Sequence, residues 1–223
     1  MLQRLTVDSG QLTVDSYLSL KLIGCDRPKL IGNFSKIVKL IICPGIHPPE
    51  LTESFVAGLR LGEICQSEDI LIVPGKDYPV YSGFHILQFV CDRTPICPPA
   101  HQPTCPLVFI SFSAGVVGAI AAAKAWRRMG GTVKAFIALD GWGVPLFGDF
   151  PIYRVSHDEF THWSSALMGS GEESFYADPG VEHLELWRSP QTVRGWWVNR
   201  EGMCEPSSAA EFLILLLDRF EKG

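Results

Sequence analysis

One serine of this chain stands where an apolar run meets a helix of small residues. Residues 107–112 are apolar and typical of a buried strand, while 114–129 are rich in alanine and end before two glycines, as a helix does. Ser113, between them, is expected to project from a sharp turn. The first N–H groups and the dipole of the helix would face negative charge that develops beside its hydroxyl. Gly115 and Gly118 leave room for close packing of the backbone.

The motif around this serine resembles the nucleophile elbow of the α/β-hydrolase superfamily, Gly-x-Ser-x-Gly. Residues 111–115 (SFSAG) match it with serine in place of the first glycine. The resemblance extends in strand and helix order from about Val38 to the C-terminus and identifies no subfamily. It implies a mostly parallel central sheet with helices on both faces, with little or no lid domain. It also implies an oxyanion hole formed by the backbone N–H groups of Ile46, in the loop 44–48 (PGIHP), and Ala114.

The same resemblance implies a carboxylate that follows the serine in the chain. Asp158 comes just after the strand predicted at 152–156, the family's usual place for the acid, and is the preferred candidate. Asp140, at the end of the strand predicted at 133–139, is the alternative acid. Its competing interpretation is a turn former in Asp140-Gly141.

The base is expected to be a histidine further along the chain. His183 follows a weak strand and an Asp-Pro-Gly turn, where the family places its catalytic histidine, and is preferred. His162 is the alternative base, and His157 is a third candidate that adjoins Asp158. A triad needs an imidazole that reaches the serine hydroxyl and has a carboxylate on its other nitrogen. His47 either lines the pocket or is a loop residue without a role.

A metal site is the competing interpretation of the histidines. His157, Asp158 and His162 have ligand types suited to zinc or iron. The segment begins as a strand end and lacks a further ligand cluster, so the sequence predicts no metal and no other cofactor.

Alternating strand and helix signals lead up to and follow these residues. Strands are predicted at 37–43, 69–73, 107–112, 133–139, 152–156 and 174–177, and helices at 50–65, 82–92, 114–129, 189–198 and 209–220. The strands at 37–43 and 133–139 are largely apolar on both faces. This pattern predicts an α/β fold with a parallel sheet covered on two sides.

Composition limits the classes of partner. Of the 223 residues, 47% are apolar and 19% charged, and the net charge of −5 with no long basic run makes nucleic acid an unexpected partner. No apolar run reaches the length of a membrane span. Seven irregularly spaced cysteines without a CxxC pair, and no visible signal peptide, favour a cytoplasmic protein with reduced thiols.

The N-terminal segment is set apart from the rest. Residues 5–9 (LTVDS) return at 12–16, too short a unit for a repeat architecture. Residues 1–34 are therefore predicted to be an N-terminal extension without an assigned role. Residues 35–223 are predicted to form a single domain.

Two functions are compatible with these patterns. The first is an esterase- or thioesterase-type serine hydrolase that acts on a small or modest-sized acyl substrate. The second is a protein that keeps the fold as a binder or scaffold and has lost the chemistry, because function lies in a site rather than in a fold. The sequence leaves the oligomeric state open.

Overall fold

The structure is a computed structural model that describes residues 38–94, 96–97, 102–103, 105–169 and 171–222. The predicted extension at 1–34 lies outside the described residues, as do positions 35–37 of the predicted domain.

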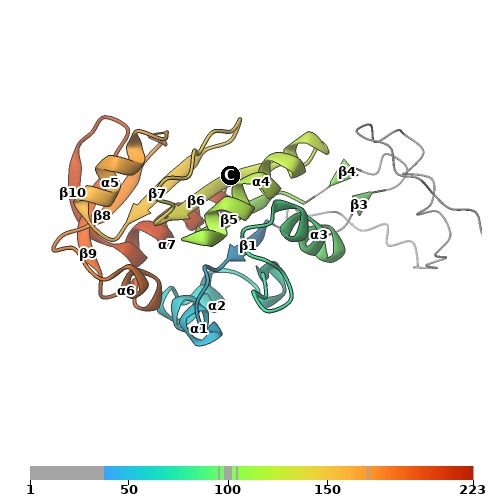
Figure 1. The fold of residues 1–223 in the computed structure, drawn as a ribbon, viewed down its shortest axis with the longest axis horizontal. Helices are drawn as coiled ribbons and strands as arrows, with labels where there is room; N and C mark the ends of the chain where they lie inside the picture. Colours follow the sequence, from blue (N-terminus) through green and yellow to red (C-terminus); the bar gives the residue numbers. More distant parts are fainter. Residues whose placement is uncertain (1–37, 95, 98–101, 104, 170, 223) are drawn as a thin grey trace, which may run out of the picture. The chain divides into compact units, whose positions relative to one another are not determined.

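The described chain is built on an eight-stranded sheet with the order β10-β9-β8-β7-β6-β5-β1-β2 (Figure 1). The strands from β8 to β2 in that order run parallel, and β9 and β10 are antiparallel to their neighbours. The strands are β1 (Lys39–Cys43), β2 (Ile70–Ile72), β5 (Leu107–Phe112), β6 (Val133–Leu139), β7 (Ile152–Ser156), β8 (Ser174–Ala177), β9 (Arg194–Val198) and β10 (Cys204–Ser208). A separate two-stranded ladder joins β3 (Ile96–Cys97) to β4 (Gln102–Pro103).

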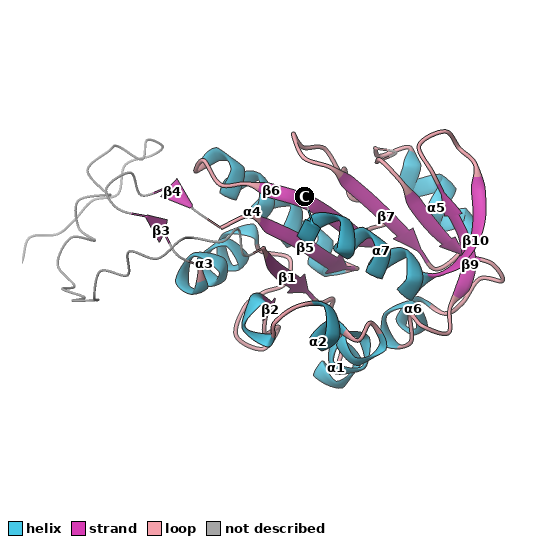
Figure 2. Ribbon diagram, turned by 180° about the vertical axis from the view of Figure 1, so that it is seen from behind, coloured by secondary structure: helices cyan, strands magenta, loops and turns pink. Residues whose placement is uncertain are grey.

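Helices cover both faces of the sheet. One face packs against α1 (Pro49–Gly58), α2 (Leu61–Ile64), α6 (His183–Arg188) and α7 (Ala209–Lys222). The other packs against α3 (Gly83–Arg93) and α4 (Ala114–Arg128). Figures 1 and 2, seen from opposite sides, show α4 in front of the strands in one view and α7 in front of them in the other. The coarse prediction of an α/β fold with a two-sided, mostly parallel sheet is confirmed.

The central strands are apolar on both faces because each face has its own core. All six residues of β5 are buried, and alternate members belong to different clusters: Val108 and Ile110 pack on the α1 and α7 side, Leu107 and Phe109 on the α3 and α4 side. A strand in a parallel sheet is buried on both faces, and its sequence is therefore a continuous apolar run.

The predicted helix at 189–198 is wrong. Residues 194–198 form β9, which pairs antiparallel with both β8 and β10. Helix α6 precedes it at 183–188, and the helix α5 (Glu159–Ala166) and the strand β10 were not predicted. The predicted helix at 50–65 is divided into α1 and α2 at Arg60, whose φ of 50° is left-handed.

The order of the strands creates a crevice at one edge of the sheet. From β1 the chain moves to β2 on one side, and from β5 it moves to β6 on the other. Such a switch point leaves an opening at the carboxyl ends of the two strands, where open α/β sheets bind their ligands. Ser113 follows β5, and the loop 44–48 follows β1. Within the part of the chain that the structure describes, no helix is both long and apolar enough to cross a membrane.

Candidate active site

Ser113 occupies the turn between β5 and α4 in a sparsely populated backbone conformation. Its φ is 52° and its ψ is −124°. A non-glycine residue in such a conformation costs about 1–3 kcal/mol, and the cost persists only where the surroundings impose it. Here the N–H of Ser113 donates to Leu139 O (2.9 Å), and its carbonyl accepts from Val116 N (3.0 Å). The strand β6 and the first turn of α4 therefore hold the serine in place.

Gly115 is required by the close approach of α4 to the end of β1. A Cβ at this position would lie 2.3 Å from Pro44 O and 2.6 Å from Cys43 O. Both obstacles are backbone atoms, so neither can turn aside as a side chain could. The glycine thus sets the distance between the serine turn and the loop after β1.

That loop borders the serine directly. A Cβ on Gly45 would lie 3.1 Å from the Cβ of Ser113. Ala114 is the first residue of α4, so its N–H has no acceptor within the helix. Among the described residues, neither its N–H nor that of Ile46 makes a hydrogen bond. Both predicted oxyanion donors are therefore without a hydrogen bond: Ala114 directly follows Ser113, and Ile46 lies in the loop after β1 that borders it.

Ser111, which replaces the first glycine of the elbow motif, does not obstruct the turn. It is fully buried in β5, and its Oγ donates to Ile137 O at 3.2 Å. The strand β6 thus accepts the hydrogen bond of the serine hydroxyl that replaces the glycine of the motif.

His183, the predicted base, begins α6 and is fixed from two sides. Its Nδ1 lies 2.8 Å from Oδ2 of Asp140, and its ring stacks on Phe112 with centroids 4.6 Å apart. A carboxylate accepts hydrogen bonds, so Nδ1 is the donor, and in the neutral ring Nε2 then has the lone pair. The histidine is thus in the tautomer that a general base requires.

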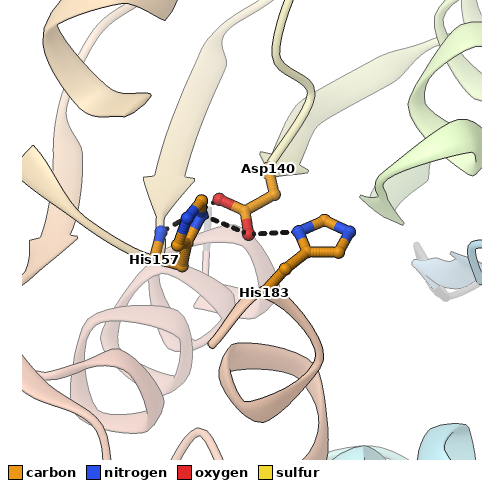
Figure 3. Close-up of side chains that lie close together, drawn as sticks. All are labelled: Asp140, His157 and His183. Carbon is orange, nitrogen blue, oxygen red and sulfur yellow. Dashed lines mark hydrogen bonds and ion pairs between the residues drawn. The ribbon is translucent and has the colours of Figure 1, made fainter. Parts of the chain in front are cut away.

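Asp140, the alternative acid, is the carboxylate that His183 uses. Its side chain is only 1% exposed, and its φ of 49° turns it out of β6. Oδ1 accepts the backbone N–H of His157 at 2.9 Å, and Oδ2 accepts from His183 (Figure 3). Both oxygens are engaged, so the orientation of the carboxylate is fixed.

The preferred acid, Asp158, does not contact His183 in this way, and the sequence-based preference is corrected. Its Oδ1 accepts the N–H of Thr161 (2.6 Å) as the N-cap of α5. Partial burial acts to raise the pKa of Asp158, but the hydrogen bonds from Thr161 and the nearby His157 together hold the pKa below its ordinary value. Asp158 therefore caps α5, its Oδ2 lies 3.6 Å from Nε2 of His157, and no contact with His183 is found among the described residues.

The alternative base, His162, contacts other residues. Its Nε2 lies 2.9 Å from Ser174 Oγ, its ring contacts Tyr176, and burial lowers its pKa. It does not line the cavity at Ser113. His47 donates from Nδ1 to Pro48 O (2.9 Å) and lines a second cavity of about 460 Å³ beside the loop after β1.

His157 is the site residue whose position the sequence reasoning missed. Its Nδ1 lies 3.0 Å from Asp140 Oδ2 in an ion-pair contact, although this buried nitrogen makes no well-formed hydrogen bond. Its interaction with Asp140 raises the pKa of His157 above the usual value, against the opposing effect of burial. One signal was available: β6 and β7 are consecutive parallel strands, and residues just beyond their carboxyl ends must lie close together.

These groups meet at a cavity of about 400 Å³. It is lined by Ser113, Asp140, His157 and His183, together with Thr161 and several apolar side chains. Among the described residues, no hydrogen bond joins Ser113 Oγ to His183. Bonds between nucleophile and base are often long before a substrate is bound.

The same carboxylate and two imidazoles have the ligand types of a metal site. One ligand atom from each of Asp140, His157 and His183 lies within 4.8 Å of the others. The predicted metal alternative, which combined His157 with Asp158 and His162, is not the group that the fold assembles. His162 is bonded to Ser174, and Asp140 takes the place of Asp158.

A scan against protein-family models found no match for this chain, and neither did a search of the curated proteins.

Proposed function

We propose that the chain is a serine hydrolase of the α/β-hydrolase type, acting on esters or thioesters through Ser113, His183 and Asp140. The observation that carries the proposal is the shared cavity. Ser113, on a strained strand-to-helix turn, and His183, with Nδ1 on a buried carboxylate, line the same space. The chain order of serine, acid and histidine is also that of this superfamily.

The roles follow from the atoms. Ser113 Oγ attacks the acyl carbon while His183 Nε2 accepts its proton, and Asp140 stabilises the imidazolium that forms. The N–H groups of Ile46 and Ala114 stabilise the oxyanion. His183 then returns the proton to the leaving alcohol or thiol. Water, activated by the same nitrogen, hydrolyses the acyl-enzyme and restores the free serine.

The apolar residues that line the cavity favour a neutral, apolar acyl group. Val117 and Val144 line it, together with Trp142 and Phe160, which are each 66% exposed. Exposed aromatic rings beside a reactive group offer surface that a ligand can bury. No lysine or arginine of the described chain lines this cavity to pair with an acidic acyl group. Its volume lies near the lower end for ligand pockets, which suits a modest-sized substrate.

A non-catalytic binder remains the second candidate, because one observation favours it. That hypothesis predicts no histidine within hydrogen-bonding reach of Ser113, and the described residues include no such bond. A binder would use the same apolar surface without turnover.

The experiment is hydrolysis of p-nitrophenyl esters with acyl chains of increasing length. We expect activity that requires Ser113, with kcat/KM rising by about two- to fourfold per added methylene until the cavity is filled. Ser54→Ala is the matched control, because Ser54 is exposed on α1 and its Oγ only donates to Glu50 O. Activity that survives Ser113→Ala, or none with any ester, would contradict the proposal.

A further inference from the structure

The group formed by Asp140, His157 and His183 has one atom that the proposed reaction leaves unexplained. The Nδ1 atom of His157 is buried and has no hydrogen-bond partner, although it lies 3.0 Å from a carboxylate oxygen. This nitrogen therefore has an ion-pair contact with Oδ2 but no well-formed hydrogen bond, and a buried polar atom is stabilised by a partner that completes it. The triad chemistry uses Asp140 and His183 and gives this nitrogen no task.

A divalent metal ion would complete it. We propose that Asp140 Oδ2, His157 Nδ1 and His183 Nδ1 bind Zn²⁺ or a similar borderline cation, and that bound metal switches off the serine. Two imidazoles and one carboxylate are a donor set that zinc takes in proteins, with a fourth position left open. His183 and His157 are both partly exposed at the cavity, so an ion can enter.

The geometry needs little adjustment. Oδ2 is 2.8 Å from one Nδ1 and 3.0 Å from the other. Ligands about 2.0–2.1 Å from a tetrahedral ion lie roughly 3.3 Å apart, so each oxygen–nitrogen distance would lengthen by about half an ångström or less. The ligand atoms of the two rings lie within 4.8 Å of each other and would settle at the same spacing. The other oxygen, Oδ1, is held by the N–H of His157, which supplies the outer contact that orients a metal-binding carboxylate.

Loss of the base follows from the tautomer. His183 now carries its proton on Nδ1 and offers the lone pair of Nε2. Metal binding at Nδ1 displaces the proton from Nδ1, so that this nitrogen binds the ion with its own lone pair and the neutral ring carries its proton on Nε2 instead. Nε2 is then an N–H group and can no longer accept the proton of Ser113. The regulatory part of the inference rests on the proposed hydrolase function, whereas metal binding itself does not.

The test is a titration of the full chain with Co²⁺, which reports its own coordination by visible absorption, followed by competition with Zn²⁺. We expect one equivalent bound through nitrogen and oxygen ligands. His157→Gln should weaken binding at least a hundredfold, and Asp140→Asn is the second ligand variant. The matched control is His162→Gln, because His162 lies outside the group and should leave affinity unchanged.

Two further arms separate this inference from the proposed function. Ser113→Ala should bind metal as the wild type does, and Zn²⁺ should slow fluorophosphonate labelling of the wild type at concentrations that leave His157→Gln unaffected. Binding through thiol ligands, binding indifferent to His157→Gln, or none below about 1 mM would overturn the metal site. Metal binding with no serine reactivity would retain the site and refute the hydrolase.

Discussion

At the scale of single residues, the site depends on which carboxylate meets His183. Asp140 and Asp158 each follow a strand end, and the two differ in surroundings: the side chain of Asp140 is 1% exposed and that of Asp158 is 37% exposed. The buried carboxylate of Asp140 is held in one orientation by two hydrogen-bond donors. The carboxylate of Asp158 instead accepts a hydrogen bond at the start of α5. The structure therefore assigns the support of the imidazole to Asp140.

The matched pair Asp140→Asn and Asp158→Asn tests this assignment. In Asp140→Asn, the new amide would present an N–H to His183 and force the wrong tautomer, so ester hydrolysis should fall by about 10²- to 10⁴-fold. Asparagine caps helices as well as aspartate does, so Asp158→Asn should retain activity and stability. The measurement is kcat/KM of both variants with one ester. A larger loss of kcat/KM in Asp158→Asn than in Asp140→Asn would show that Asp158, not Asp140, is the acid.

At the scale of elements, local patterns predicted the serine turn and failed for the acid. The turn is a local event: a buried strand, one serine and a helix of small residues, all adjacent in the chain. The acid depends on which strand lies beside β5 and on a positive φ at Asp140. Neither is a property of the neighbouring sequence. The strand β9 was missed for the same reason, since pairing with β8 and β10 overrides the helical signal of Pro190.

The contact between α4 and the end of β1 yields a prediction about glycine. Gly115→Ala should lower the free energy of unfolding by about 1–3 kcal/mol and slow serine labelling, because the new Cβ meets two backbone carbonyls. Gly62→Ala is the control: no atom lies within 4 Å of its Cβ, so the variant should be neutral or slightly more stable. Urea denaturation of both proteins measures the difference, and equal stabilities would show that α4 is not held so closely.

At the scale of the whole molecule, the strand order explains why the site lies where it does. The loop after β1, the serine after β5 and the acid after β6 all follow carboxyl ends of neighbouring parallel strands. The sequence predicted the two-sided sheet because apolar runs alternate with helices. It could not predict the order of the strands, and therefore could not say that Asp140 and His157 would meet.

The central claim is that Ser113 is an activated nucleophile, and its most direct test is reaction with a fluorophosphonate probe. Intact mass and peptide mapping of the folded wild type should show one equivalent of label on Ser113, and no label on Ser113→Ala. No labelling of the folded wild type, or equal labelling of the variant, would contradict the claim.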